Sequence, residues 1–117
     1  MIDKISKYDI SPSVNSFYID NMTMWIPRET RVSLRNSTNI LIDKGITTTT
    51  LWDGVLHFEI SCELLLQLLG DLEVYALQCF NKTAEHKANI MKLTSIEEIE
   101  NYNYTEGYPE KLTFSLL

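Results

Sequence analysis

Residues 61–93, SCELLLQLLGDLEVYALQCFNKTAEHKANIMKL, decide the fold of this chain. No proline interrupts the stretch, and Ser61 is a residue type that caps helices, so we predict a helix from Cys62 to Leu93. Residues at a and d heptad spacing form one stripe for about four heptads, rich in leucine at first and smaller or polar later. The stripe comprises Leu65, Leu69, Leu72, Ala76, Cys79, Thr83, His86, Ile90 and Leu93.

The length of this helix constrains the molecule. A helix of this length spans roughly 48 Å, whereas a compact domain of the chain's size is roughly 35 Å across. The helix must break near Asn81, or the molecule is elongated, or a second copy covers the overhang. We favour a homo-oligomer whose interface contains Leu65, Leu69, Leu72 and Ala76, and expect Leu72→Glu to yield a monomer. Alternatively, the stripe packs on a helix of the same chain.

The residues before the long helix predict a second helix and a β-hairpin. Pro27 suits a first helical turn and Gly45 suits a left-handed cap, so we predict a helix from Pro27 to Lys44. Ile46–Trp52 and Val55–Ile60 read as two strands joined by the type I′ dipeptide Asp53-Gly54. In the second strand, the face that should meet the core carries Leu56, Phe58 and Ile60.

The two ends of the chain are less regular. Residues 1–13 read as a loosely ordered lead-in, followed by short strands at Val14–Ile19 and Met22–Ile26. Ser95 and Glu98 form a capping box for a helix over 96–102, and alternation predicts a half-buried strand over 111–117. The fold class is therefore α+β, in a single domain over residues 1–117: helix, Trp-Asp-Gly hairpin, long amphipathic helix, short helix and C-terminal strand.

Composition and charge exclude several classes of protein. Apolar residues make up 44% and charged residues 22% of the 117, a globular balance that excludes wholesale disorder. Residues 1–58 hold six acids and six bases, and residues 59–117 hold ten acids and four bases, so the whole net charge of −6 lies in the second half. This charge argues against nucleic acid as a partner and favours a basic one. Without a long apolar run, we expect no membrane span.

The residues that could carry chemistry favour structural explanations. Cys79 and His86 lie two helical turns apart, too far for a nucleophile–base pair, and zinc would need further ligands. His57 and Cys62 flank the start of the long helix without other support for an active site. The acids at 97, 98 and 100 suit a capped first turn. We therefore predict no catalytic residues, no metal and no cofactor.

Two features favour contacts with proteins. Arg28, Arg31 and Arg35 form a row on one helix face, which suits an anion or, more readily, the acidic half of a neighbouring copy. Tyr104 and Tyr108 lie in a turn-rich segment, where amphipathic aromatic side chains can anchor a partner. We assign both tyrosines to the interface.

Four segments carry a resemblance to a known family: LWDG (51–54), LEVYA (72–76), CFNKTAEHK (79–87) and IENYNYTEGYPEKL (99–112). The chain resembles, over roughly residues 25–112, a domain family of unknown function found in phages and prophages near tail-fibre genes. Asn103 departs from the family pattern, in which an acidic residue is usual. The resemblance implies a structural or assembly role in a phage tail, and it implies no catalytic residues.

We therefore expect a non-enzymatic phage or prophage protein, a tail-fibre or baseplate accessory that acts through contacts with itself and with tail proteins. It would reside in the host bacterial cytoplasm or be incorporated into a virion. The alternative is a small acidic immunity or inhibitor protein that masks a basic toxin or nuclease.

Overall fold

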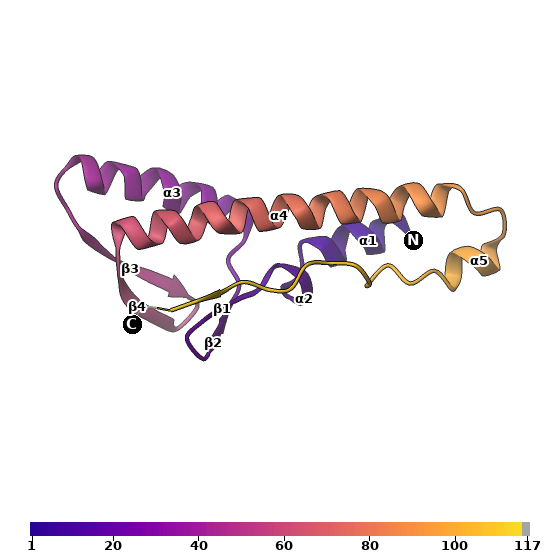
Figure 1. Ribbon diagram of the computed structural model, residues 1–117, viewed down its shortest axis with the longest axis horizontal. Helices are drawn as coiled ribbons and strands as arrows, with labels where there is room; N and C mark the ends of the chain where they lie inside the picture. Colours follow the sequence, from indigo (N-terminus) through magenta and orange to yellow (C-terminus); the bar gives the residue numbers. More distant parts are fainter. Residues whose placement is uncertain (116–117) are drawn as a thin grey trace.

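A single long helix organises the molecule, as seen in a computed structural model that describes residues 1–115 (Figure 1). Helix α4, Cys62–Met91, runs unbroken for 30 residues. The chain extends 59 Å along its longest axis and 27 and 20 Å across. The predicted helix is confirmed, although it ends two residues early, at Met91. Of the alternatives for accommodating so long a helix, the structure shows an elongated molecule.

Side-chain caps fix where α4 and the next helix begin. The Leu64 N–H donates to Ser61 Oγ at 3.1 Å, which satisfies one of the free amides of the first turn. The same arrangement starts α5, Ile96–Glu100, where the Glu98 N–H donates to Ser95 Oγ at 3.1 Å. Both starts were predicted from sequence, because a cap depends only on neighbouring residues.

Helix α3, Arg28–Asp43, confirms the predicted helix, and the hairpin follows it. Its strands are β3, Thr48–Asp53, and β4, Leu56–Ser61. Because Asp53 pairs with Leu56, the turn consists of Gly54 and Val55, so the predicted dipeptide Asp53-Gly54 is wrong by one residue. Asp53 is kept in the strand, where its carboxylate accepts the N–H of Trp25 at 3.1 Å.

The outcome on the predicted core face of β4 is mixed. Ile60 is buried and Phe58 is half-buried against the core, but Leu56 is exposed. Leu56 lies beside the turn, beyond the reach of the core, so the alternation of the strand does not bury it.

The predicted lead-in over residues 1–13 is wrong, because this segment forms α1, Ile2–Asp9, and the beginning of α2, Pro12–Asn15. Ile5 is fully buried. The Tyr75 hydroxyl of α4 donates to the carbonyl of Val14 at 2.6 Å. Contacts with α4 thus order a segment whose own sequence signals are weak.

A small sheet completes the fold. Its strands are β1, Phe17–Ile19, β2, Met22–Met24, and β5, Thr113–Phe114, in the order β2-β1-β5. All three are shorter than predicted, and β5 pairs in parallel with β1. Residues 116 and 117 of the predicted final strand lie outside the described residues.

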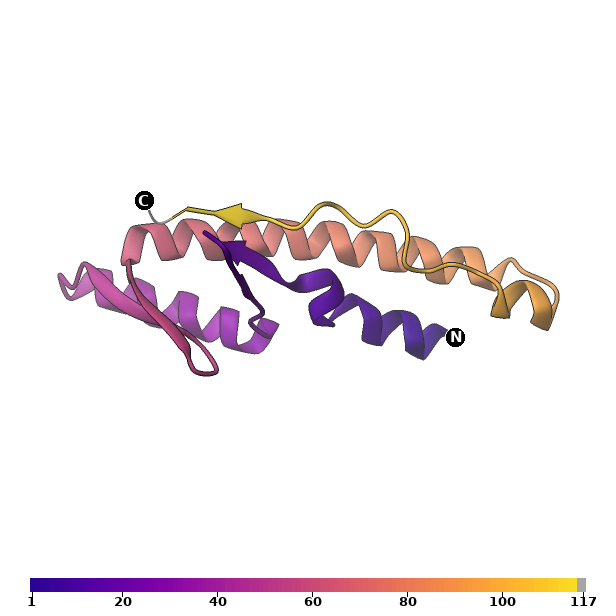
Figure 2. The same ribbon diagram turned by 90° about the horizontal axis from the view of Figure 1, so that it is seen from below.

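The elements form two rows along α4. Figure 2 shows α1 and α3 following one another along one side of α4, while the chain end that carries β5 returns along the other. The main core lies between α4, the small sheet and the hairpin. Its buried residues are Phe17, Ile19, Met24, Ile26, Leu51, Ile60, Leu65, Leu68, Leu69 and Leu72.

Gly70 lies inside α4, and a Cβ built there meets nothing within 4 Å. Gly70→Ala should therefore raise the free energy of unfolding by about 1 kcal/mol, since alanine favours the helix. Gly107 is the matched control, because its φ of +88° is costly for alanine, and Gly107→Ala should lower stability. Urea unfolding of the two variants checks both signs; a loss of stability at Gly70 would mean that another chain packs against it.

Candidate functional site

The leucines assigned to a homo-oligomer interface lie inside the chain. Leu65, Leu69 and Leu72 are all within the main core, at most 2% exposed. A heptad stripe buries equally well against strands of its own chain, and here the small sheet and the hairpin cover it. These three side chains offer no surface to a partner, whereas Ala76, one turn further on, is half-buried and lines a groove.

Tyr104 and Tyr108 hold the chain end against the rest of the molecule. The Tyr8 ring meets both rings edge to face, with centroids 5.6 and 5.5 Å away. The hydroxyl of Tyr108 also hydrogen-bonds Thr83 Oγ1 at 2.7 Å. Burial raises the pKa of Tyr108. Both tyrosines are half-buried, so each leaves only part of its ring for a partner.

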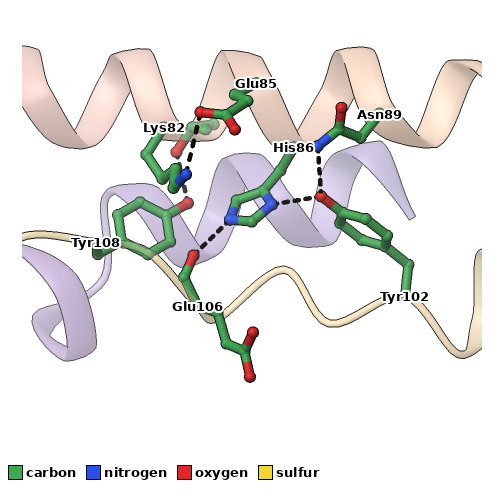
Figure 3. Close-up of polar contacts among 8 residues, drawn as sticks. Lys82, Glu85, His86, Asn89, Tyr102, Glu106 and Tyr108 are labelled. Carbon is green, nitrogen blue, oxygen red and sulfur yellow. Dashed lines mark hydrogen bonds and ion pairs between the residues drawn. The ribbon is translucent and has the colours of Figure 1, made fainter.

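His86 links α4 to the chain end that follows α5 (Figure 3). It is buried; Nε2 donates to the Glu106 carbonyl at 2.8 Å, and the Tyr102 hydroxyl, 2.6 Å from Nδ1, donates to it. Asn89 also donates to the Tyr102 oxygen at 3.1 Å. Both ring nitrogens are thus used by the protein itself, so this histidine fixes the return of the chain along α4.

Neither cysteine is placed for nucleophilic chemistry. Cys62 and Cys79 are free thiols and both are buried. Burial raises the pKa of Cys79 to about 11, which keeps it protonated at neutral pH. Among residues 1–115, no three His, Cys, Asp or Glu side chains are grouped to hold a metal ion.

A groove of about 600 Å³ opens where α1 ends and α3 begins, with α4 as its floor. Figure 2 shows the end of α1 and the beginning of α3 on the same side of α4. Most of its apolar lining comes from Ile10, Trp25, Ile26, Pro27, Leu77 and Phe80. Its charged residues are Asp9, Arg28, Arg31, Glu73 and Lys87.

At one end of the groove, two buried side-chain atoms, one on Arg31 and one on Glu73, lack hydrogen bonds to the described part of the chain. Arg31 is only 8% exposed, and its Nε finds no acceptor among the described residues. Burial lowers the pKa of Arg31, and the nearby Glu73 carboxylate opposes that effect. Glu73 Oε1 lies 3.7 Å from Arg28 Nε and is itself buried without a hydrogen bond. Buried polar groups are rarely left in this state.

The other end of the groove holds a balanced pair of charges. Burial raises the pKa of Asp9, while a hydrogen bond from Thr83 and the charge of Lys87 lower it. The side chain of Asn15 also donates to the Asp9 carbonyl, closing the end of α1.

The predicted arginine row is divided by the fold. Arg28 and Arg35 are exposed, but Arg31 points into the groove. Sequence reasoning identified the three arginines as a surface and missed the groove, because the groove is built from three segments that are far apart in sequence. The one available signal was the row itself, with Pro27 opening the helix beside it.

A second feature that sequence reasoning missed is the apolar tip of the hairpin, which we define as Trp52, Val55 and Leu56. These side chains are 55%, 90% and 42% exposed. The Trp52 ring is stacked on His57 with centroids 4.2 Å apart and so has one preferred orientation. Alternation within the predicted strand gave no sign that Trp52 would be exposed.

These features define a small mixed α+β domain built around one long helix. Comparison with models of protein families, with curated proteins and with solved structures finds no match for the chain. None of the helices within residues 1–115 combines the length and the apolar character needed to cross a membrane.

Proposed function

We propose that this chain is a non-enzymatic protein-binding module, an accessory or assembly protein of a phage or prophage tail fibre or baseplate. The observation that supports protein binding is the apolar tip. Val55 lies at the turn, with Trp52 on one face of the hairpin and Leu56 on the other. Apolar side chains exposed at the end of a rigid element are a common feature of binding surfaces, and tryptophan is among the residues that contribute most to binding.

The build of the hairpin suits the apolar tip to this role. Six residue pairs join β3 and β4, and Asp53 ties the base of the turn to Trp25, so the tip is held in place before it meets a partner. A surface that is already ordered loses less conformational entropy on binding. A second copy of the chain is the partner we propose, with phage tail proteins as further partners.

The phage setting rests on the resemblance over residues 25–112. The YTEGYP segment (104–109), which contributes to that resemblance, packs on α1 and α4 through its tyrosines. In this proposal the segment holds the module together, while the apolar tip makes the contacts.

Solution mass tests the proposal. Light scattering after size exclusion, at low and high salt, should give more than one chain per particle at both, because an apolar contact resists salt. Val55→Asp should reduce the mass to that of one chain while keeping the fold, since aspartate suits turns. Ile96→Asp, at the exposed start of α5, is the control and should change nothing. If the wild-type chain had the mass of a monomer at both salt concentrations, self-association would be contradicted.

A second candidate is the acidic inhibitor of a basic protein. It is favoured by α5, where Glu97, Glu98 and Glu100 are all exposed at one end of the molecule (Figure 1). Binding of this kind should weaken strongly as salt rises. The salt dependence of any complex therefore separates the two candidates.

A further inference from the structure

The groove between α1, α3 and α4 contains a buried guanidinium group whose Nε lacks a hydrogen-bond acceptor among the described residues. Arg31 is more than nine-tenths buried, lines the groove, and its Nε–H donates to no acceptor among residues 1–115. A buried guanidinium left in this state is costly, and an anion in the groove would relieve it. The beginning of α3, with its free amides, adds positive potential at the same end.

The charges of the groove specify how much negative charge a ligand should carry. Glu73, 3.7 Å from Arg28, balances one of the two guanidinium groups, and Lys87 faces Asp9 at the other end. Three bases and two acids line the groove, which leaves one positive charge without compensation. A monoanion would neutralise the groove, whereas a dianion such as a phosphate would leave one excess negative charge beside Glu73.

The remaining walls specify the rest of the ligand. Leu77 and Phe80 on α4 are 58% and 59% exposed, and Trp25 also lines the groove. Covering such apolar surface is favourable at about 25 cal/mol per Å². The volume of about 600 Å³ lies within the range of small-molecule sites. An inorganic anion would leave these apolar walls exposed to water, and an uncharged apolar molecule would leave Arg31 Nε without a hydrogen-bond acceptor.

We infer that this groove binds a small amphipathic monocarboxylic acid, with its carboxylate on Arg31 and its apolar chain over Leu77 and Phe80. The site goes beyond the proposed function and shares no residue with the apolar tip. A guanidinium and a carboxylate form strong charge-assisted hydrogen bonds, which suits Arg31 to this role.

Calorimetry on the full chain tests the inference with decanoate, kept below its micelle concentration, and decanol, which has the same chain length without the charge. Decanoate should bind at one molecule per chain, and decanol at least tenfold more weakly. Arg31→Met should weaken decanoate binding at least tenfold, whereas Arg35→Met, an exposed arginine on the same helix, should change it less than twofold.

A second pair of variants keeps the test decisive if Arg31→Met does not fold. Leu77→Glu puts a like charge on the groove floor and should abolish decanoate binding. Val74→Glu, equally exposed on α4 but outside the groove, should leave it intact. The inference would be overturned if decanol bound as tightly as decanoate. It would also be overturned if the groove variant and its control, in either pair, lost equal affinity for decanoate. A synthetic peptide of residues 94–103, which contains the exposed acids of α5, is the last probe. If the groove binds this peptide but not decanoate, the inference is also overturned, because the groove would then be a site for a protein partner.

Discussion

Leu72→Ala should lower the free energy of unfolding by about 2–5 kcal/mol, the range for deleting a fully buried leucine side chain. Leu72 is 2% exposed and packs within the main core. The cost combines the lost burial of the side chain with the cavity that remains between α4 and the strands. Urea unfolding followed by circular dichroism measures it.

Leu77→Ala is the matched control for Leu72→Ala. It has the same chemistry on the same helix, five residues further on, but Leu77 is more than half exposed. Its cost should stay within about 0.5 kcal/mol. Equal costs at the two positions would mean that α4 is rotated about its axis relative to this structure. For the same reason Leu72→Glu should unfold the chain, rather than yield the folded monomer that the heptad pattern suggests.

His86→Leu should lower stability by about 1–3 kcal/mol, because it removes the two hydrogen bonds of the buried imidazole, to the Glu106 carbonyl and with the Tyr102 hydroxyl. Tyr102 loses one of its two partners and keeps Asn89. The damage should be local, since the contact joins α4 only to the returning chain end. Hydrogen–deuterium exchange should therefore rise first over residues 102–108.

His57→Leu separates this effect from the general effect of losing a histidine. His57 is exposed, stacks on Trp52 and contacts only a backbone carbonyl two residues away. Its replacement should leave the exchange of residues 102–108 unchanged. If His57→Leu loosened that segment as much as His86→Leu, the link drawn here between α4 and the chain end would be wrong.

Local signals account for the parts of the fold that could be predicted. The caps at Ser61 and Ser95, the proline before α3 and the alternation in the hairpin act within a few residues, so they can be recognised in the sequence. The helix α1 could not be recognised in this way, because eight residues are too few to be stable alone. Ile5 and the neighbouring Val14 are ordered by packing on α4.

The working surfaces were harder to predict, since each depends on which residues the fold leaves uncovered. The leucines of the heptad stripe were assigned to an interface between copies, which is wrong, because nothing in a stripe says whether strands of the same chain or another helix will cover it. Arg31 differs from Arg28 and Arg35 only through the residues that the fold places around it. The apolar tip lies one residue from its predicted turn, and that shift exposes Val55 at the turn itself.

The central claim, that the apolar tip is the contact surface, is tested most directly by a dilution series of the full chain followed by amide NMR. Amides of residues 52–57 should shift or broaden as the concentration rises, while those of α5 stay constant. The claim would be contradicted if the amide signals changed with concentration only in other elements. It would also be contradicted if no amide signal changed although the measured mass exceeded that of one chain.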